Sequence, residues 1–269
     1  MRQHLQRQTF LGPDSDRRIA GARAGVVGLC GGGSHVVQQL AHIGLGGFEL
    51  MDFDRADGTN RNRMVGLSAR AAKRQSLKID VMRRLVKSVN PTAKVNAFAG
   101  RWQDNAPALR SCDVIFGCVD SYDQRRQLEL FARRYQVPYI DVGMDVSGEE
   151  AQHVVSGQVI LSMPGCPCMR CMGFLSEELL AAEANKYGAA GARPQVVWPN
   201  GVLASTAVGL FVSLLTPWNS EMTPPLYSEY DGNRMTVTLS RKLLYLEGKQ
   251  CPHFPIEPGA LGDVDWGAG

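Results

Sequence analysis

The sequence lacks three features that would place it in common classes of protein. No apolar run is long enough to cross a bilayer, since the longest, residues 202–215, holds Ser205, Thr206 and Ser213 and is interpreted as a buried helix. No basic stretch followed by an apolar one marks a secretory leader near the N-terminus. The formal net charge of +3 is too small on its own to indicate nucleic-acid binding. We therefore expect a cytoplasmic protein with no membrane and no nucleic-acid partner.

Cysteine is present, but its seven residues do not form the even set that is typical of a disulfide framework. Three of them fall within residues 166–171, which fits a reducing compartment and a metal or thiol site better. A chain of 269 residues can bury a substantial core. We expect a single domain over 1–269, with a nucleotide-binding half (1–150) and a second half (151–269).

The first half alternates between apolar runs and helical patterns. Strands are predicted at 24–29, 47–52, 94–99, 113–118 and 137–142, and helices at 34–44, 69–89, 104–110 and 122–135. This alternation predicts an α/β fold with a Rossmann-like, doubly wound and mostly parallel sheet.

The pattern changes after Gly143 and predicts an antiparallel C-terminal extension. The predicted elements are a strand at 152–162, a helix at 176–186, a crossing loop at 187–199, a helix at 201–215 and a hairpin of 235–240 with 242–246. The tail, 257–269, is Gly-rich and acidic, and is predicted to be disordered.

A glycine-rich turn follows the first predicted strand and reads Gly28-Leu-Cys-Gly31-Gly-Gly33. The N–H groups of such a turn and the next helix N-terminus can bind a phosphate. A dinucleotide fingerprint needs glycine where this chain has Cys30, whose Cβ would crowd a pyrophosphate. The turn therefore indicates a nucleotide other than NAD, although an ordinary tight strand-to-helix turn remains an alternative.

Acidic and basic residues follow the second predicted strand. Asp52 ends that strand, where an acidic residue commonly binds ribose hydroxyls. Asp54 is either a ligand or a loop cap. Asn60 and Arg63 follow, and hydride transfer has no use for an arginine cluster beside the phosphates.

In this order the motifs resemble those of the ThiF/MoeB/HesA-type adenylating enzymes, which include the ubiquitin-activating enzymes. That family has G-x-G-G-x-G-S, D-x-D and S-N-L-x-R-Q, where this chain has G-L-C-G-G-G-S, D-F-D and T-N-R-N-R-M. The resemblance covers most of residues 5–215 and extends to the bacterial type that activates ubiquitin-like proteins. It implies ATP binding by Gly28, Gly31, Gly33, Asp52, Asp54 and Asn60.

The resemblance also implies catalytic residues. Arg63 and Lys78 fall on the family's catalytic Arg and Lys, with Lys73 as a rival for the lysine. Asp120 falls on the carboxylate of the magnesium site. Arg7 falls on an arginine that reaches the ATP of the partner subunit, which implies a homodimer.

The chemistry of adenylation agrees with these residue types. A carboxylate must approach an α-phosphate, and Arg63 and Lys78 would offset the repulsion between the two anions. The attacking carboxylate is already ionised at pH 7, so no general base is needed. Four positions depart from the family pattern, namely Cys30, Arg61, Met64 and Ser121.

The resemblance implies a structural zinc held by Cys168 and Cys171 with Cys251 and His253, and free buried thiols are the alternative. Many family members carry a catalytic cysteine in the crossing loop, but residues 172–250 contain none. Either the enzyme stops at the adenylate, or a thioester forms elsewhere. Cys166 is the candidate for that thioester, although a flanking loop residue is the preferred interpretation.

The sequence thus predicts ATP-dependent adenylation of the C-terminal glycine of a ubiquitin-like protein, with release of pyrophosphate. The product would pass to a conjugating enzyme in a bacterial conjugation or antiviral-defence system. Two alternatives are activation of a sulfur-carrier protein for thiamin or molybdopterin synthesis, and a non-catalytic nucleotide-binding scaffold. An NAD enzyme is disfavoured by Cys30.

Overall fold

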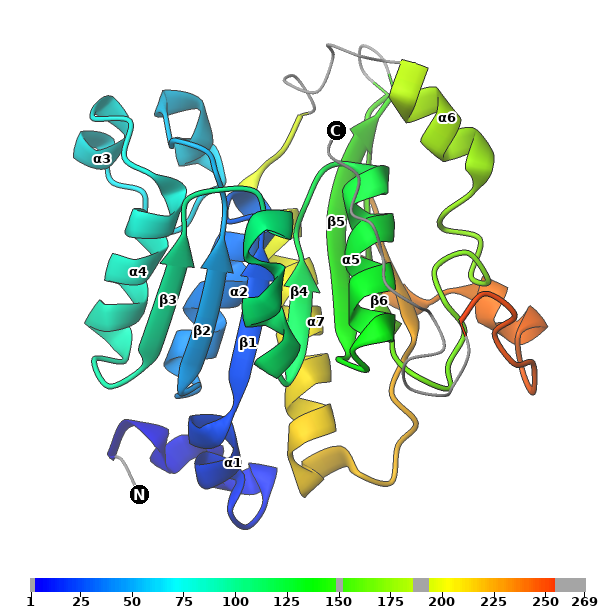
Figure 1. The fold of residues 1–269 in the computed structure, drawn as a ribbon, viewed down its shortest axis with the longest axis horizontal. Coiled ribbons are helices and arrows are strands. Elements are labelled where there is room, and N and C mark those ends of the chain that lie inside the picture. The colour runs from blue at the N-terminus through cyan, green and yellow to red at the C-terminus, as the bar shows by residue number, and fades with distance from the viewer. Residues whose placement is uncertain (1–2, 149–151, 186–193, 255–269) are drawn as a thin grey trace.

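The computed structural model describes residues 3–148, 152–185 and 194–254. Its centre is an eight-stranded sheet in the order β3-β2-β1-β4-β5-β6-β7-β8 (Figure 1). The strands are β1 (Arg23–Val27), β2 (Gly47–Met51), β3 (Lys94–Phe98), β4 (Val114–Gly117), β5 (Tyr139–Ser147), β6 (Val154–Ser162), β7 (Tyr227–Asp231) and β8 (Thr236–Leu239). Strands β1 to β5 pair in parallel, and β6, β7 and β8 are added antiparallel. The predicted fold class is confirmed.

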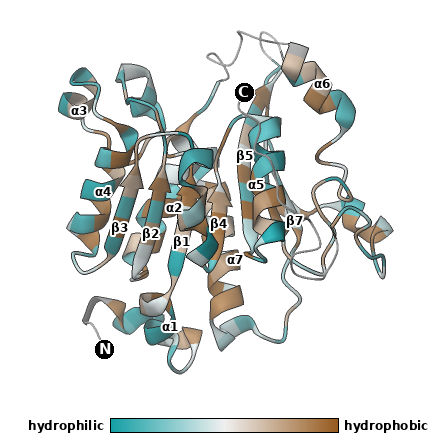
Figure 2. Cartoon of the chain, viewed as in Figure 1, coloured by the Kyte–Doolittle hydropathy of each residue, from teal (hydrophilic) through white to brown (hydrophobic). Residues whose placement is uncertain are grey.

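Helices cover both faces of this sheet. They are α1 (Ser15–Gly21), α2 (Gly31–His42), α3 (Ala69–Lys73), α4 (Lys78–Val89), α5 (Tyr122–Arg134), α6 (Glu177–Asn185) and α7 (Val197–Leu215). Short 3-10 helices are η1 (Gln3–Leu11), η2 (Gly58–Asn62), η3 (Gln103–Ser111), η4 (Pro217–Asn219) and η5 (Arg241–Tyr245). Figure 2 shows brown, apolar strands at the centre and teal on the outer helix surfaces.

Two apolar cores lie on opposite faces of the sheet, because successive strand residues point to opposite sides. Val26 packs into the core formed with α2, α4 and α7. Its neighbour Val27 packs into the core formed with η3 and α5. A sheet buried on both faces is the arrangement that places a nucleotide cleft at the strand ends.

Helix α7 is apolar enough, by length and composition, to cross a membrane, with a mean hydropathy of 1.4. Half of that stretch is buried inside the protein. Leu203, Ala207 and Phe211 belong to the core shared with α2. The helix therefore behaves as a core helix, as predicted for residues 201–215, although it begins earlier, at Val197.

The predicted helix at 69–89 was wrong in one respect, since it is two helices. The first helix, α3, ends at Lys73, and shortly after it Gln75 has a positive φ of 48°. Between the helices, Ser76 accepts a backbone hydrogen bond from Ala56 (2.8 Å), and Leu77 forms a bridge with Arg55. The apolar spacing continues through the break, so periodicity does not reveal it. The break makes Lys78 the first residue of α4.

The predicted C-terminal hairpin was also wrong, because β7 pairs with β8 and residues 241–245 form η5. Asp231 sets the turn, since its side chain accepts from the backbone N–H groups of Asn233 (3.1 Å) and Arg234 (3.0 Å). The predicted disordered tail and residues 186–193 of the crossing segment lie outside the described residues, and residues 197–199 of the predicted loop belong to α7.

Candidate functional site

A cleft of about 1130 Å³ opens at the carboxyl ends of β1, β2 and β4. The strand order reverses between β1 and β4, which is the usual position of a ligand in this class of sheet. The cleft brings together eight of the predicted residues, namely Gly28, Gly31, Asp52, Asp54, Asn60, Arg63, Lys78 and Asp120.

The backbone conformation of the turn requires glycine at positions 28 and 33. A Cβ on Gly33 would lie 1.8 Å from the carbonyl oxygen of Gly28, and Gly28 has a φ of +87°. A Cβ on Gly31 would lie 2.7 Å from the side-chain nitrogen of Asn200. Gly33 therefore lets α2 pack against the turn, while Gly28 and Gly31 face the cleft.

Cys30 occupies the N-cap position of α2 and lines the cleft. Burial raises the pKa of its thiol, although Lys78 and Arg63 oppose that shift. The thiol is therefore neutral at pH 7, so Cys30 adds no charge to the phosphate-binding turn.

Asp52 ties the glycine turn to the end of β2. Its carboxylate accepts from the backbone N–H groups of Leu29 (2.7 Å) and Asp54 (2.8 Å). Burial raises the pKa of Asp52, while Lys78 and the two N–H donors oppose that shift. Asp52 thus shapes the turn as well as lining the cleft.

Lys78 is paired with Asp54 at a Nζ–Oδ2 distance of 2.6 Å. Burial alone would lower the pKa of Lys78, but Asp52 and Asp54 raise it above its usual value. The ammonium therefore stays charged inside the cleft. The rival, Lys73, is exposed at the end of α3 and is not among the residues that line the cleft.

Arg63 follows η2, which a capping box fixes in place. Asp57 accepts from the backbone of Thr59 (2.7 Å), and Asn60 Oδ1 accepts from the backbone of Asp57 (3.1 Å). Arg63 Nη1 donates to the carbonyl of Thr59 (2.7 Å). Its Nε is buried with no hydrogen-bond partner among the described residues. The loop thus holds the guanidinium through Nη1 and leaves the buried Nε–H without a described partner.

Asp120 lies just after β4, where Gln195 approaches its carboxylate (3.3 Å). Gln195 belongs to the far end of the crossing segment, and Asn62 donates to its carbonyl oxygen (2.9 Å). Sequence reasoning missed Gln195, because only the fold brings residue 195 to the ends of η2 and β4.

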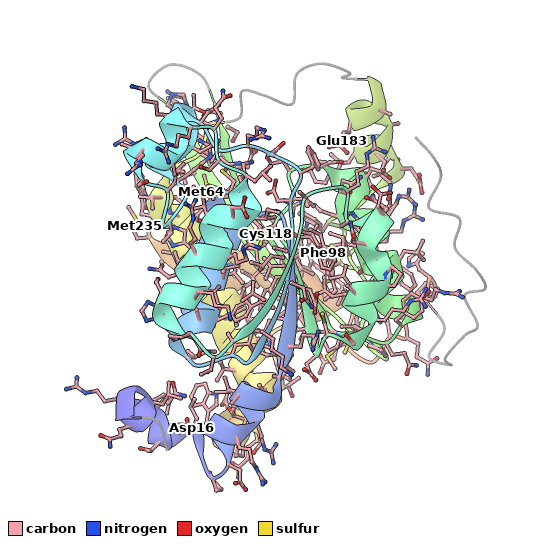
Figure 3. All side chains as sticks on the ribbon, turned by 60° about the vertical axis from the view of Figure 1, so that its left-hand side comes forward. Asp16, Met64, Phe98, Cys118, Glu183 and Met235 are labelled. Atoms are coloured by element: carbon pink, nitrogen blue, oxygen red, sulfur yellow. The ribbon has the colours of Figure 1, made fainter. Side chains whose placement is uncertain are left out.

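Glu183 of α6 was also missed, and it binds the N-terminus of α5 (Figure 3). Its carboxylate accepts from Ser121 Oγ (2.9 Å) and from the backbone N–H groups of Tyr122 and Asp123 (3.0 Å each). A negative charge is favourable at this end of a helix. Ser121, which departs from the family pattern, therefore holds α6 beside the cleft.

Arg125 lies at the floor of the cleft and forms a buried ion pair with Asp141 of β5. Tyr139 also donates to Asp141 (3.0 Å). The sequence offered no signal for this pair, because its partners come from a helix and from the next strand.

The four predicted metal ligands converge away from the cleft. Sγ of Cys168 and of Cys171 lie 3.4 Å and 3.3 Å from Nδ1 of His253. Sγ of Cys171 lies 3.7 Å from that of Cys251, and all four ligand atoms lie within 4.8 Å of one another. Ligands of a tetrahedral zinc with bonds of about 2.0–2.3 Å lie roughly 3.5–3.8 Å apart. The donor set and its spacing therefore fit zinc.

Cys166 and Arg7 do not reach this cleft. Cys166 follows the end of β6, where Ser162 pairs with Tyr139, the first residue of β5. It therefore lies at the amino ends of the parallel strands, whereas the cleft lies at their carboxyl ends. Arg133 donates to the backbone oxygen of Cys166 (2.9 Å), and burial raises the pKa of the thiol. Arg7 is exposed on η1, which also lies at the amino ends of the parallel strands (Figure 1).

Several curated proteins are similar to parts of this chain. A tRNA threonylcarbamoyladenosine dehydratase of Haemophilus influenzae is 32% identical over 49% of this chain and 51% of its own length. A molybdopterin-synthase adenylyltransferase of Salmonella typhimurium is 28% identical over 61% of this chain and 64% of its own. A ubiquitin-like modifier-activating enzyme 5 of Caenorhabditis briggsae is 24% identical over 55% of this chain and 35% of its own. The match thus spans less than two thirds of each relative.

Solved structures share the fold. The structure of Escherichia coli MccB with ATP has a TM-score of 0.73 at 16% identity, over 95% of this chain and 74% of that one. The structure of PaaA has a TM-score of 0.65 at 15% identity, over 83% and 74% of the two chains. The model of one protein family matches residues 2–252, which is nearly the whole sequence, and it describes the ThiF family. The chain therefore belongs to the ThiF family.

Proposed function

We propose that this protein adenylates the C-terminal glycine carboxylate of a ubiquitin-like protein. The observation that carries the proposal is the convergence of Arg63, Lys78 and Asp120 on one cleft beside a glycine turn. Two cations flanking a phosphate site favour a reaction in which two anions meet. A hydride transfer would not need them.

The residues divide the work of the proposed reaction. The N–H groups of the glycine turn and the N-terminus of α2 bind phosphate oxygens. Arg63 and Lys78 stabilise the negative charge that builds on the α-phosphorus. A carboxylate oxygen forms a bond to that phosphorus while the bond to the bridging oxygen breaks, and pyrophosphate leaves. No proton is transferred, because the carboxylate is ionised at pH 7.

Asp120 would hold a magnesium ion beside the phosphates. Its carboxylate is exposed at the cleft, and Mg²⁺ is typically bound by one or two carboxylates together with substrate phosphates. When bound, the ion would neutralise charge on the leaving pyrophosphate.

The activated acyl group would leave as the adenylate and pass to a conjugating enzyme, within a bacterial conjugation or antiviral-defence system. The position of Cys166 at the opposite end of the sheet supports direct transfer over a thioester on that residue.

A homodimer would complete the site. Arg7 lies on η1, at the end of the sheet opposite to the cleft of its own chain (Figure 1). It could therefore contact only the ATP of a partner subunit. The cluster of Cys168, Cys171, Cys251 and His253 would bind a structural zinc, and we expect the protein in the cytoplasm.

Activation of a sulfur-carrier protein is the second candidate. Among the relatives named above, the molybdopterin-synthase adenylyltransferase aligns with the largest shares of both chains. The first step would be the same, because a glycine carboxylate is adenylated in either case. Only the acceptor of the acyl group would differ.

Exchange of labelled pyrophosphate into ATP tests the proposed function. We expect exchange only with a partner that ends in a free glycine carboxylate, and none when one residue is added after that glycine. Asp120→Ala should abolish the exchange. If no Gly-ended ubiquitin-like or sulfur-carrier protein supports exchange, the proposal is wrong.

A further inference from the structure

The formal net charge of +3 hides a strong charge asymmetry. Residues 55–101 contain 12 Lys or Arg residues and only two carboxylates, a formal charge of +10. The rest of the chain contains 17 basic and 24 acidic residues, a formal charge of −7. One contiguous segment thus holds all of the positive excess.

The basic residues of this segment lie at the surface. Apart from Arg63 and Lys78 in the cleft, all are exposed, namely Arg55, Arg61, Arg70, Lys73, Arg74, Arg83, Arg84, Lys87, Lys94 and Arg101. We call these ten residues the basic face. They come from η2, α3, α4, β3 and the adjoining loops, which form one side of the molecule (Figure 1).

The helices turn their charged sides outward. In α4 the buried positions include Ile79, Met82 and Val86, so Arg83 and Lys87 lie on the solvent side. Nitrogen-tipped side chains surround the α3 ribbon in Figure 3, which turns this side toward the viewer. None of these charged side chains belongs to either apolar core. Within the fold, Lys87 donates to the carbonyl oxygen of Ala93 (2.6 Å) and Arg83 pairs with Asp80 (2.9 Å).

We propose that the basic face binds the phosphate backbone of a folded RNA. Lys and Arg side chains that neutralise phosphates supply most of the affinity in such contacts, without any pocket for a base. The two carboxylates of the segment, Asp57 and Asp80, do not offset its charge. The inference departs from the expectation drawn from net charge alone.

The position of the cleft favours RNA over duplex DNA. Arg55 and Arg101 belong to the basic face and also line the cleft. An RNA backbone bound along the basic face would therefore reach the opening of the cleft. A cleft can receive an unstacked nucleotide from a loop, and folded RNA displays such nucleotides. Duplex DNA keeps its nucleotides stacked. The inference does not rest on the proposed adenylation, because backbone binding requires no reaction.

Fluorescence anisotropy with a labelled RNA hairpin of roughly 16 base pairs tests this inference, measured without ATP. The triple variant Arg83→Gln/Arg84→Gln/Lys87→Gln should weaken binding about tenfold or more and lower the salt slope by about three. The matched control is Arg234→Gln/Arg241→Gln/Lys249→Gln, which removes three exposed charges near β8. That control should bind RNA like the wild type.

Three results would overturn the inference. The first is no RNA binding at about 50 mM salt, where backbone contacts are strong. The second is equal weakening in the α4 variant and its control. The third is binding of duplex DNA or of poly-glutamate as tight as that of the hairpin, which would assign the face to DNA or to an acidic protein. Far-ultraviolet circular dichroism of each variant checks that it is folded.

Discussion

Gly32 and Gly33 are neighbours in the glycine turn, but only one of them has to be glycine. A Cβ on Gly33 would lie 1.8 Å from a backbone oxygen, whereas one on Gly32 meets nothing closer than 3.5 Å. A backbone clash of that size cannot be relieved without moving the turn. In the family motif quoted above, position 32 is variable and position 33 is glycine. The clash distances give a physical reason for that difference.

The first prediction therefore compares Gly33→Ala with Gly32→Ala. We expect Gly33→Ala to lose most ATP affinity and to lower the melting temperature. Gly32→Ala should fold normally, since its new Cβ makes ordinary contacts. Calorimetric ATP titration and thermal melts measure both effects, and equal behaviour of the two variants would contradict this account of the turn.

The second prediction concerns Lys78. Lys78→Ala should reduce pyrophosphate exchange by about 100- to 1000-fold, the range found when one group that stabilises a transition-state charge is removed. Lys73→Ala should keep exchange close to wild type, because Lys73 lies outside the cleft. The opposite ranking of these two variants would assign the catalytic role to Lys73.

The raised pKa of Lys78 also predicts how pyrophosphate exchange should depend on pH. Its pairing with Asp54 is fully present below the pKa of an unfolded lysine, about 10.4, and is lost as pH rises through the higher folded-state pKa. Exchange should therefore show no loss from Lys78 deprotonation near neutrality. A basic limb between about pH 7 and 8 that disappears in Lys78→Arg would contradict the pKa direction.

At the scale of elements, the buried pair of Arg125 and Asp141 joins α5 to β5 beneath the cleft. Arg125→Met should cost about 3–5 kcal/mol of unfolding free energy, because it leaves Asp141 charged and buried without its partner. The double variant Arg125→Met/Asp141→Leu should recover much of that loss. Chemical denaturation of these two variants and of Asp141→Leu alone gives the coupling energy, and additive losses of the two single variants would show that the pair is not coupled.

The fourth prediction concerns the cluster that joins the 168–171 loop to the C-terminal segment. Metal analysis should find about one zinc per chain in the wild type and much less in Cys251→Ala. A chelator should lower the melting temperature of the wild type. Cys166→Ala should keep the metal, because Cys166 is not one of the four converging ligands.

The elements also show what the sequence could predict. The alternation of apolar runs with helical patterns was enough to predict the parallel sheet, because β1, β2 and β4 are buried almost throughout. The break before Lys78 was not predictable, since the apolar spacing continues across it. Glu183 and Gln195 were missed because no local motif marks a residue whose partners lie about sixty or more positions away.

At the scale of the molecule, the cleft lies at the carboxyl ends of the parallel strands and Arg7 lies at their amino ends. If Arg7 acts on a partner subunit, mixing two inactive variants should restore activity. Arg7→Ala and Lys78→Ala, co-refolded in equal amounts, would form heterodimers with one intact site in two. We expect pyrophosphate exchange to return to about a quarter of wild type, since half of the dimers are mixed. No recovery would contradict action in trans.

The charge asymmetry also belongs to the scale of the molecule. It is fully readable in the sequence, yet the total of +3 conceals it because acidic residues elsewhere cancel the basic segment. Only the fold shows that the basic residues of α3 and α4 lie together beside the cleft. A charge count by segment would have found the face, but not its position.

The central claim is that a carboxylate attacks the α-phosphate of ATP. Labelling the terminal carboxylate of a Gly-ended partner with ¹⁸O tests it directly, because the oxygen that attacks stays on the phosphorus. We predict that, after the acyl group is transferred, mass spectrometry finds one ¹⁸O atom in AMP and none in pyrophosphate. Label in inorganic phosphate, with ADP as the other product, would place the attack on the γ-phosphate and contradict the account.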